Sequence, residues 1–327
     1  MSQPWSGNLP SQPAVSVVIP CYRVTEYITG TLSSLRTQTF RNFETIVVND
    51  GCPDTSNLEH ALEPFREEVV YIRQENQGVS AARNAGIGAA RAPLIALLDG
   101  DDEWEATYLE KHVALLDSHP EIDAVYPNVL LVGKNPWAGR LMMDIYPSRG
   151  EVTFAKVVRQ ECTVFSCLTA RRSSLERGGL FDPALRSAED MDLWLRMLHS
   201  GAKITYHSEP LVRHRLRRGS LSDDQTWIAF TTLRMFGKLL GTLELTDEER
   251  QALVDEIGRV NAVMNLVHAR RALYRKNPAE ALERFASANR VLKQWRLSVA
   301  IGILRVWPKL LSSYVRRKFP HEELYVR

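Results

Sequence analysis

The stretch LIALLDGDDEW, residues 94–104, decides the fold class of this 327-residue chain. Five apolar residues, 94–98, are followed at once by the acids Asp99, Asp101 and Asp102. A short continuous apolar run predicts a strand that is buried on both faces. The three carboxylates then stand at the carboxyl end of that strand, where open α/β sheets bind their ligands.

The chain before this stretch alternates short apolar runs with helical patterns. We expect strands at 15–19, 43–48 and 69–72. The expected helices are 24–38, 55–66, 79–90 and, after the acids, 105–118. Such alternation is typical of βαβ units and predicts an α/β fold, with a mostly parallel central sheet covered by helices on both faces.

The alternation loosens after 122–133, and the sequence predicts a surface loop at 133–150. Beyond it we expect a helix at 188–201 and strands at 203–206 and 211–215, and then helices only. Residues 269–288 have the small-residue rhythm of one tetratricopeptide-like hairpin. The expected parts are a disordered lead-in at 1–14, an α/β domain at 15–218, a helical appendage at 219–296 and a basic amphipathic segment at 297–327.

Composition excludes several classes of protein. The chain is 44% hydrophobic and 24% charged, as in ordinary globular proteins, and its net charge of +2 gives no reason to expect a nucleic acid partner. Its four cysteines have neither disulfide-framework nor zinc-site spacing, so we expect reduced thiols, with Cys21 and Cys52 on neighbouring strand ends. No signal peptide or spanning run is recognisable, which predicts a cytoplasmic protein.

The three acids after the strand need an explanation of their charge. One Asp at such a place commonly caps the next helix. Three within four positions repel one another and raise one pKa unless a cation lies among them. Carboxylates are the ligands that Mg²⁺ and Mn²⁺ prefer, so the stretch predicts a divalent metal site.

An ordered series of motifs resembles a known family. The segments are VSVVIPCYRVTEYITGTLSSLRTQTFRNFETIVVNDGCPDTS, QENQGVSAARNAGIGAARAPLIALLDGDDEW and GLFDPALRSAEDMDLWLRM. Over roughly residues 15–218 they are similar, in order and spacing, to the family-2 inverting glycosyltransferases of the GT-A fold. The resemblance implies a Rossmann-like nucleotide half, an acceptor half, a nucleoside-diphosphate-sugar donor and a divalent cation on its diphosphate.

The resemblance also implies roles for residues in the nucleotide half. Pro20 and Tyr22 would flank the base, and Asp50 would accept a hydrogen bond from a ring N–H, which favours uracil and leaves guanine open. Arg83 would lie near the base or phosphates, with a structural salt bridge as the equal alternative. The alternative for Tyr22 is a core or rim aromatic, and the alternative for Asp50 is a turn cap. Asn49 and Cys52 depart from the usual motif, which has an acid and a serine there.

The remaining implied roles concern the metal and the base. Asp101 is the first choice for metal ligation, Asp99 would bind ribose or metal, and Asp102 would support them. His214 would be a third metal ligand or a phosphate contact, or else part of a basic solvent loop with Arg215, Arg217 and Arg218. These arginines could otherwise clamp the diphosphate as a lid. Asp190 matches the catalytic base, although acids are also favoured in a first helical turn, where the helix dipole lowers their pKa. Within that helix we expect an Asp192–Arg196 pair and a buried stripe of Met191, Trp194, Leu195 and Leu198.

The C-terminal segment is basic. From Arg296 to the end it has seven Lys or Arg and two Glu, a net charge of +5, among Trp, Leu and Ile. This composition suits a helix lying in a membrane interface, or one docked on the protein with a basic outer face.

The leading hypothesis is a metal-dependent enzyme that adds one sugar to a glycan or lipid-linked acceptor for the cell envelope or an exopolysaccharide, on the cytoplasmic side of the membrane. The alternative is a non-catalytic nucleotide-sugar-binding or scaffolding protein that acts through its helical appendage. A nucleotidyltransferase is disfavoured because no Gly-rich loop followed by Arg or Lys opens the first helix.

Overall fold

The computed structural model describes residues 5, 10–134, 136–217, 225–310, 313 and 317. The chain forms two compact units, Met1–Arg218 and Gly219–Arg327. Within the expected lead-in, residues 1–4 and 6–9 lie outside the described part. Trp5 contacts Tyr71, with ring centroids 5.0 Å apart, and its carbonyl accepts a hydrogen bond from the Tyr71 amide.

Unit 1 is built on an eight-stranded sheet with the order β3-β2-β1-β4-β7-β6-β8-β5. The strands are β1 (Val15–Cys21), β2 (Phe43–Asp50), β3 (Val69–Gln74), β4 (Leu94–Leu97), β5 (Glu103–Trp104), β6 (Ala124–Val132), β7 (Thr169–Arg171) and β8 (Ile204–Arg215). The first four pair in parallel, as do β6 and β8, whereas β7 is antiparallel to β4 and β6, and β5 is antiparallel to β8. The sheet is therefore mixed, with most strands running in one direction.

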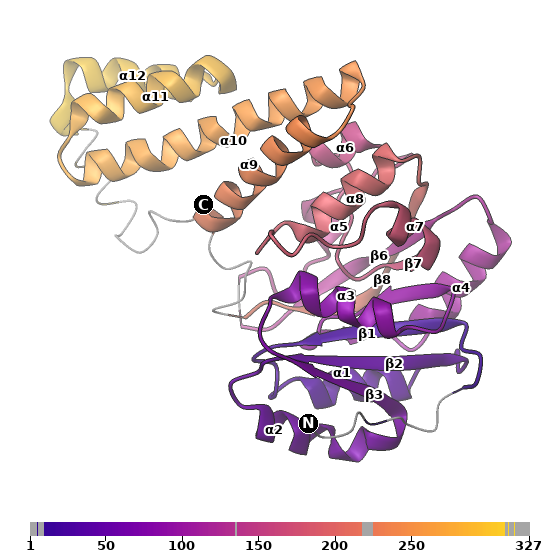
Figure 1. Ribbon diagram of the computed structural model, residues 1–327. Helices are drawn as coiled ribbons and strands as arrows, with labels where there is room; N and C mark the ends of the chain where they lie inside the picture. The colour runs from indigo at the N-terminus through magenta and orange to yellow at the C-terminus, as the bar shows by residue number, and fades with distance from the viewer. Residues whose placement is uncertain are drawn as a thin grey trace. The chain divides into compact units, whose positions relative to one another are not determined.

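Helices flank this sheet on both faces (Figure 1). They are α1 (Ile28–Arg36), α2 (Thr55–Leu62), α3 (Val79–Ala89), α4 (Tyr108–Ser118), α5 (Met142–Ile145), α6 (Phe154–Val158), α7 (Arg172–Arg177) and α8 (Glu189–His199). The 3₁₀ turn η1 (Glu63–Glu68) follows α2, since Pro64 has no amide hydrogen to continue the α-helical pattern.

The alternating residues of β1 explain why its sequence is apolar throughout. Val15, Val17 and Ile19 belong to the hydrophobic core that also contains the buried side chains of α1 and α2. Val18 points to the opposite face, where α3 approaches so closely that a Cβ built on Gly86 would lie 2.3 Å from Val18 Cγ1. Both faces of β1 are thus covered, as a parallel strand between helical layers requires.

The second half of unit 1 departs from the expected elements. The two strands expected at 203–206 and 211–215 form one strand, β8, whose pairing with β6 shifts register around Asn128. The expected loop at 133–150 contains the short helix α5. The three-residue strand β7 and the helices α6 and α7 were not expected, because elements this short carry no clear periodicity.

Unit 2 is helical, with α9 (Gln225–Thr242), α10 (Asp247–Tyr274), α11 (Pro278–Leu292) and α12 (Trp295–Val306). A capping box starts α10, in which Thr246 and Glu249 exchange side-chain and backbone hydrogen bonds. The expected hairpin at 269–288 is formed by the end of α10 and by α11, which pack through small residues and Phe285. In the part of the chain that the structure describes, no helix has both the length and the apolar character needed to span a bilayer.

Candidate functional site

The acidic loop, residues 99–102, is held against the carboxyl end of β1. The Asp102 amide donates to the Asp99 carbonyl at 3.0 Å and closes a tight turn. A Cβ on Gly100 would lie 3.0 Å from Val24 Cγ2 and 3.2 Å from the Pro20 carbonyl oxygen. Any larger residue would require Val24 or the Pro20 backbone to move by a few tenths of an ångström. Gly100 therefore favours the close approach that places the three acids at the strand-end edge of the sheet.

Asp102 is fully buried and anchors the end of β8. Its carboxylate oxygens accept from His214 Nδ1 at 2.9 and 3.0 Å, and one of them also accepts from the Arg215 amide at 2.9 Å. Burial alone would lower the pKa of His214, but the adjacent Asp102 outweighs it and raises this pKa to about 9. Asp102 therefore faces a protonated imidazole, which fits a supporting role behind the site.

Asp101 pairs with an arginine from the segment after β8. Arg217 Nε donates to Asp101 Oδ2 at 2.6 Å, and the Asp101 side chain is 14% exposed. Burial and the neighbouring Asp102 raise the pKa of Asp101, and Arg217 opposes this rise. Arg218, its basic neighbour in the sequence, lies outside the described residues.

Arg83 bridges Asp99 to the helix that carries the expected base. Its guanidinium lies 2.7 Å from Asp99 Oδ1 and 2.8 Å from Glu189 Oε1, and the side chain is only 3% exposed. Burial alone would raise the pKa of Asp99, but Arg83 holds this pKa below its ordinary value. The alternative of a structural salt bridge for Arg83 is therefore realised, inside the candidate site.

These pairs change the argument for a metal. Repulsion among three uncompensated acids was the reason to expect an ion, yet Asp99, Asp101 and Asp102 each have a cation from the chain. Among the residues that the structure describes, no three His, Cys, Asp or Glu side chains form a ready metal cluster. Metal ligation by Asp99, Asp101 and His214 thus stays a prediction.

The donor types nevertheless fit a hard divalent ion. Asp99 and Asp101 offer carboxylate oxygens, as Mg²⁺ and Mn²⁺ prefer. Because Nδ1 of His214 is taken by Asp102, Nε2 is the ring atom left for a metal, in the carboxylate–histidine arrangement common in metal sites. The protonated imidazole would have to lose its Nε2 proton before that atom could bind an ion. An ion on Asp101 Oδ2 would have to displace Arg217.

Asp190 is the second residue of α8, and its Oδ1 accepts from the Met191 amide at 2.7 Å. Burial raises its pKa to about 7, helped by Glu189 and Asp99 and opposed by Arg83. The expectation that the helix dipole lowers this pKa is wrong, because burial and two neighbouring carboxylates outweigh the dipole. The preceding Ala188 has φ 60°, a left-handed conformation that is strained for alanine and sets the entry to α8.

The rest of α8 follows the expected pattern in part. Trp194 and Leu195 are buried, and Arg196 pairs with the fully buried Asp192 at 2.7 Å. The expected Met191 and Leu198 are only partly buried, while Leu193 and Met197 fill the core in their place. The buried face is therefore rotated relative to the predicted stripe.

Asp50 holds the loop before α3. Its carboxylate accepts from Gln74 Nε2 at 2.7 Å and from the amides of Gln77 and Gly78 at 2.9 and 2.8 Å. The side chain is almost fully buried. This arrangement is a loop anchor, close to the turn-capping alternative, and it leaves one of the roughly four carboxylate acceptor positions for a base.

The two departures from the family motif are accounted for locally. Asn49 donates to the Tyr71 hydroxyl at 2.8 Å and to Thr55 at 3.0 Å, and accepts from the Cys52 amide at 2.8 Å. An acid at position 49 could not make both donations. The Cys52 thiol in turn donates a hydrogen bond to the Asp54 carboxylate at 2.8 Å.

Pro20 and Tyr22 lie where β1 ends, beside the acidic loop. Pro20 is partly exposed and Tyr22 is 38% exposed, with the Arg23 guanidinium 5.3 Å from its ring centroid. An exposed ring at this edge is able to stack on a base.

All four cysteines are free and buried, and burial together with Cys52 raises the pKa of Cys21.

Two residues at the site were missed by the sequence reasoning. Ser166 donates to Asp99 Oδ2 at 3.4 Å, and the Cys167 thiol lies 3.6 Å from Asp102 Oδ2. Both precede β7, which runs against its neighbours and so begins at the edge where β4 ends. The sequence around them carries no motif that could have revealed this placement.

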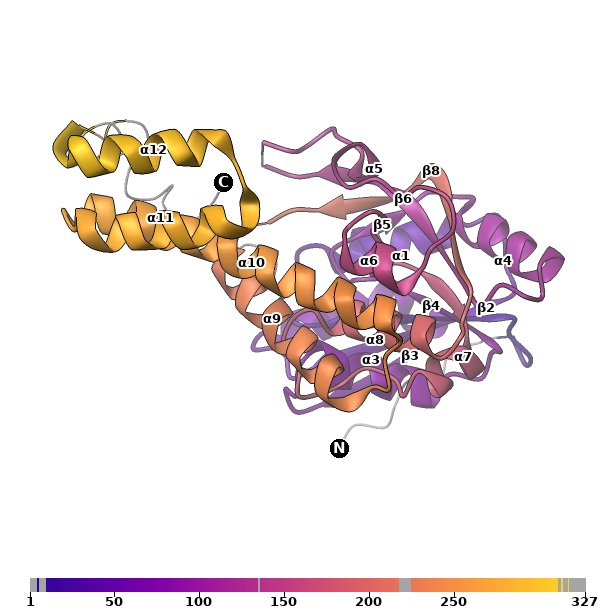
Figure 2. The same cartoon turned by 90° about the horizontal axis from the view of Figure 1, so that it is seen from above.

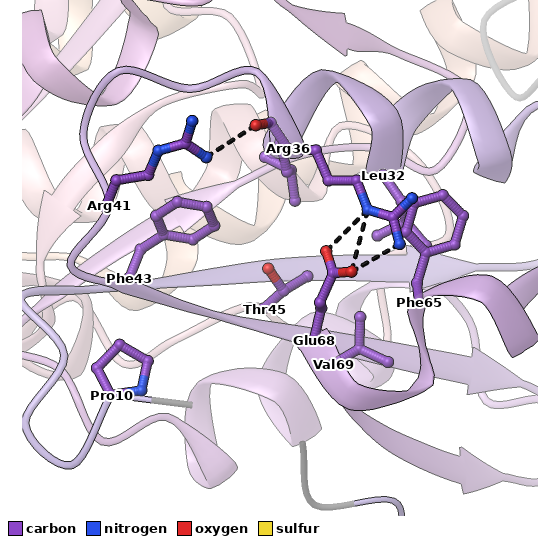
Figure 3. Close-up of a pocket in the computed structure, with 10 residues that line it drawn as sticks. Pro10, Leu32, Arg36, Arg41, Phe43, Thr45, Phe65, Glu68 and Val69 are labelled. Carbon is purple, nitrogen blue, oxygen red and sulfur yellow. Dashed lines mark hydrogen bonds and ion pairs between the residues drawn. The ribbon is translucent and has the colours of Figure 1, made fainter. Parts of the chain in front are cut away.

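A cavity of about 210 Å³ lies at the opposite edge of the sheet, where β2 and β3 begin (Figure 3). Its lining includes Phe43, Phe65 and Arg36. The Arg36 guanidinium donates hydrogen bonds to the Glu68 carboxylate and lies over the Phe65 ring, 4.1 Å from its centroid. This volume is below the roughly 300–1,000 Å³ of typical small-molecule sites. None of the predicted site residues lines it.

Comparison with known families and proteins gives a consistent result. The family model described as glycosyl transferase family 2 matches residues 16–179. The putative teichuronic acid biosynthesis glycosyltransferase TuaG of Bacillus subtilis is 27% identical over 228 residues, which cover 67% of this chain and 88% of TuaG. The putative glycosyltransferase EpsH of the same organism is 33% identical over 219 residues, covering 64% of this chain and 62% of EpsH.

Solved structures share the fold. Residues 1–349 of TarS from S. aureus, crystallised with UDP, align with a TM-score of 0.61 and 18% identity over 93% of this chain and 87% of theirs. The mannosyltransferase PcManGT from Pyrobaculum calidifontis, in complex with GDP-Man and Mn²⁺, aligns with a TM-score of 0.60 and 17% identity over 98% and 92% of the two chains. At these identities the likeness is one of fold.

Proposed function

Since this chain belongs to glycosyl transferase family 2, we propose that it transfers one sugar, with inversion, from a nucleoside-diphosphate sugar to an acceptor hydroxyl. A UDP-sugar is the favoured donor, with a GDP-sugar as the second choice. TarS was crystallised with UDP and PcManGT with GDP-Man and Mn²⁺, which supports this class of donor. The acceptor we propose is a glycan or lipid-linked glycan of the cell envelope, as the teichuronic acid role in the name of TuaG suggests.

The observation that carries the proposal is the raised pKa of Asp190, caused by burial and by the neighbouring Glu189. A carboxyl group with a pKa of about 7 is a far better proton acceptor near neutrality than an ordinary surface aspartate. In a single displacement, the acceptor hydroxyl attacks the anomeric carbon opposite the leaving diphosphate, and its proton must go to a base on that side. We assign this role to Asp190.

The acidic loop would serve the donor. Asp101 and Asp99, with His214 as a third ligand, would hold Mg²⁺ or Mn²⁺, and Asp102 would orient His214. A divalent ion there neutralises charge on the leaving diphosphate. Pro20 and Tyr22 would flank the base, while Asp50 would accept from its ring N–H.

Of the two arginines at the site, Arg217 changes its partner in this scheme and Arg83 keeps its own. With Asp101 engaged by an ion, Arg217 is released and can turn to the diphosphate, since arginine forms bidentate bonds with phosphate. Arg83 stays between Asp99 and Glu189, because it is buried and bonded to both. Arg83 would thereby hold the acidic loop, on the donor side, at a fixed distance from the helix that carries Asp190.

The alternative is a non-catalytic nucleotide-sugar-binding or scaffolding protein that acts through unit 2. Asn49 and Cys52 were its support in the sequence. Their hydrogen bonds account for them as local structure, so they no longer favour loss of activity. The raised pKa of Asp190 favours the enzyme.

Calorimetric titration of the full chain with UDP-, GDP- and dTDP-sugars, in Mn²⁺ and in EDTA, tests the donor and the metal. We expect one donor class to bind with Mn²⁺ and to bind much more weakly in EDTA. Release of nucleoside diphosphate, measured with the bound donor and glycan acceptors, then tests catalysis. Absence of binding to all three classes would overturn the proposal, and binding without release would favour the non-catalytic alternative.

A further inference from the structure

Helix α12 is apolar on two opposite faces. Its inner face consists of Leu297, Ile301 and Leu304, spaced by four and three residues, and packs into the cluster formed by α10 and α11. Figure 2 shows α12 lying alongside α11. Of the two alternatives for the C-terminal segment, docking on the protein is seen for this face of the helix, and residues 311–312, 314–316 and 318–327 of the segment lie outside the described part.

The outer face of α12 carries three apolar side chains, spaced by four and seven residues, that are exposed in the part of the chain that the structure describes. Trp295, Val299 and Val306 are 72%, 51% and 65% exposed. At 100° per residue these three side chains fall within about 40° of one another, and about 180° from the inner set. The apolar surface continues past the helix with Trp307 and Leu310, which are 64% and 61% exposed.

Positive charge flanks this outer face. Arg296 and Arg305 are exposed and fall about 80–100° to either side of the Trp295–Val306 line. Lys309 follows, and from residue 294 to 310 the sequence has three basic residues and no Asp or Glu. The Arg296 guanidinium lies over the Trp295 ring, 5.6 Å from its centroid, so one of the flanking cations is held beside the outer apolar face.

We propose that the outer face of α12 binds the surface of an anionic lipid bilayer. Tryptophans favour the headgroup level, Val299 and Val306 would enter the acyl boundary, and the flanking cations would contact anionic headgroups. A second copy of the chain is a poorer occupant, because pairing this face with itself would bring cations of one sign together. The inference does not rest on the proposed transfer reaction, since no residue of α12 is assigned to the site.

Co-sedimentation of the full chain with vesicles tests this proposal. We expect binding to phosphatidylglycerol-containing vesicles, little binding to phosphatidylcholine alone, and loss of binding at high salt. The variant Val299→Asp and the double variant Arg296→Gln/Arg305→Gln should each weaken binding by roughly tenfold or more. The matched control is Val254→Asp on α10, where a valine of similar exposure, 49%, is replaced and binding should persist.

Donor binding by calorimetry and thermal melting are measured on every variant. Both should be unchanged, because the substituted side chains point away from the inner face. Equal vesicle binding by wild type and both outer-face variants would overturn the proposal, as would binding that ignores lipid charge. A dimer seen by light scattering that Val299→Asp dissolves, without vesicle binding, would instead make this face a self-association surface and also overturn it.

Discussion

Arg83 and Glu189 form a buried ion pair of 2.8 Å, although 106 residues separate them in the sequence. Arg83 lies on α3 and Glu189 opens α8, so the pair ties the first half of unit 1 to the helix of Asp190. Glu189 also adds negative charge beside Asp190 and raises its pKa. One side chain thus both fixes Arg83 and tunes the proposed base.

Glu189→Gln should lower the pKa of Asp190. The substitution removes a neighbouring negative charge, and it also leaves the charge of Arg83 less balanced, which favours ionised Asp190 further. We expect the acid limb of the pH–rate profile to shift to lower pH. Glu121→Gln, at an exposed loop position, is the control and should leave the pH–rate profile unchanged. An unchanged profile in Glu189→Gln would contradict the effect of the Glu189 charge on the pKa of Asp190.

The pH dependence of the wild-type enzyme follows from Asp190 itself. A base must be ionised to accept a proton, so kcat/KM should fall about tenfold per pH unit below about 7 and level off above it. Initial rates measured from pH 5 upward at saturating Mn²⁺ check this. A rate that stays level from neutral pH down to pH 5 would show that the base is an ordinary carboxylate.

Asp190→Asn should abolish transfer and leave nucleotide affinity largely intact. The amide keeps the size of the side chain and its acceptor oxygen for the Met191 amide, but it cannot take the proton, and lost general-base catalysis costs roughly 10²–10⁴-fold. Rates of nucleoside diphosphate release and calorimetry of donor binding are compared with wild type. Persisting turnover would place the base elsewhere.

Asp101→Ala should remove metal-dependent nucleotide binding. The change deletes a proposed ligand and leaves Arg217 without its 2.6 Å partner. Calorimetry with Mn²⁺ and EDTA measures the effect, and Asp117→Ala, an exposed acid on α4, serves as the control. Titrations that match the wild type in both media would refute metal ligation by Asp101.

Two glycines on α3 give a matched test of its packing on the sheet. Gly86→Ala should destabilise the protein by about 1–3 kcal/mol, because the new Cβ would lie 2.3 Å from Val18 Cγ1. Gly88→Ala meets no atom within 4 Å and should stabilise the helix by about 0.5–1 kcal/mol. Urea unfolding measures both, and equal effects would contradict the close approach of α3.

The sequence located the acids but not their partners. Asp99, Asp101 and Asp190 could be placed because strand ends and a first helical turn are read from local pattern. Ser166 and Cys167 could not, since their position depends on a reversed three-residue strand. The pKa of Asp190 was predicted in the wrong direction for a related reason: the helix dipole is a local property, whereas burial and the contacts of Glu189 depend on how distant segments pack.

The reversed strand β7 also constrains how the sheet is assembled during synthesis. Strands β1 to β4 pair among themselves and are complete once residue 97 has been made. In the described sheet, the strands β6 and β8 join them through Thr169–Arg171. A nascent chain can therefore pair its first parallel block early, whereas the segments that bring Asp190 and His214 to the acidic loop are synthesised much later.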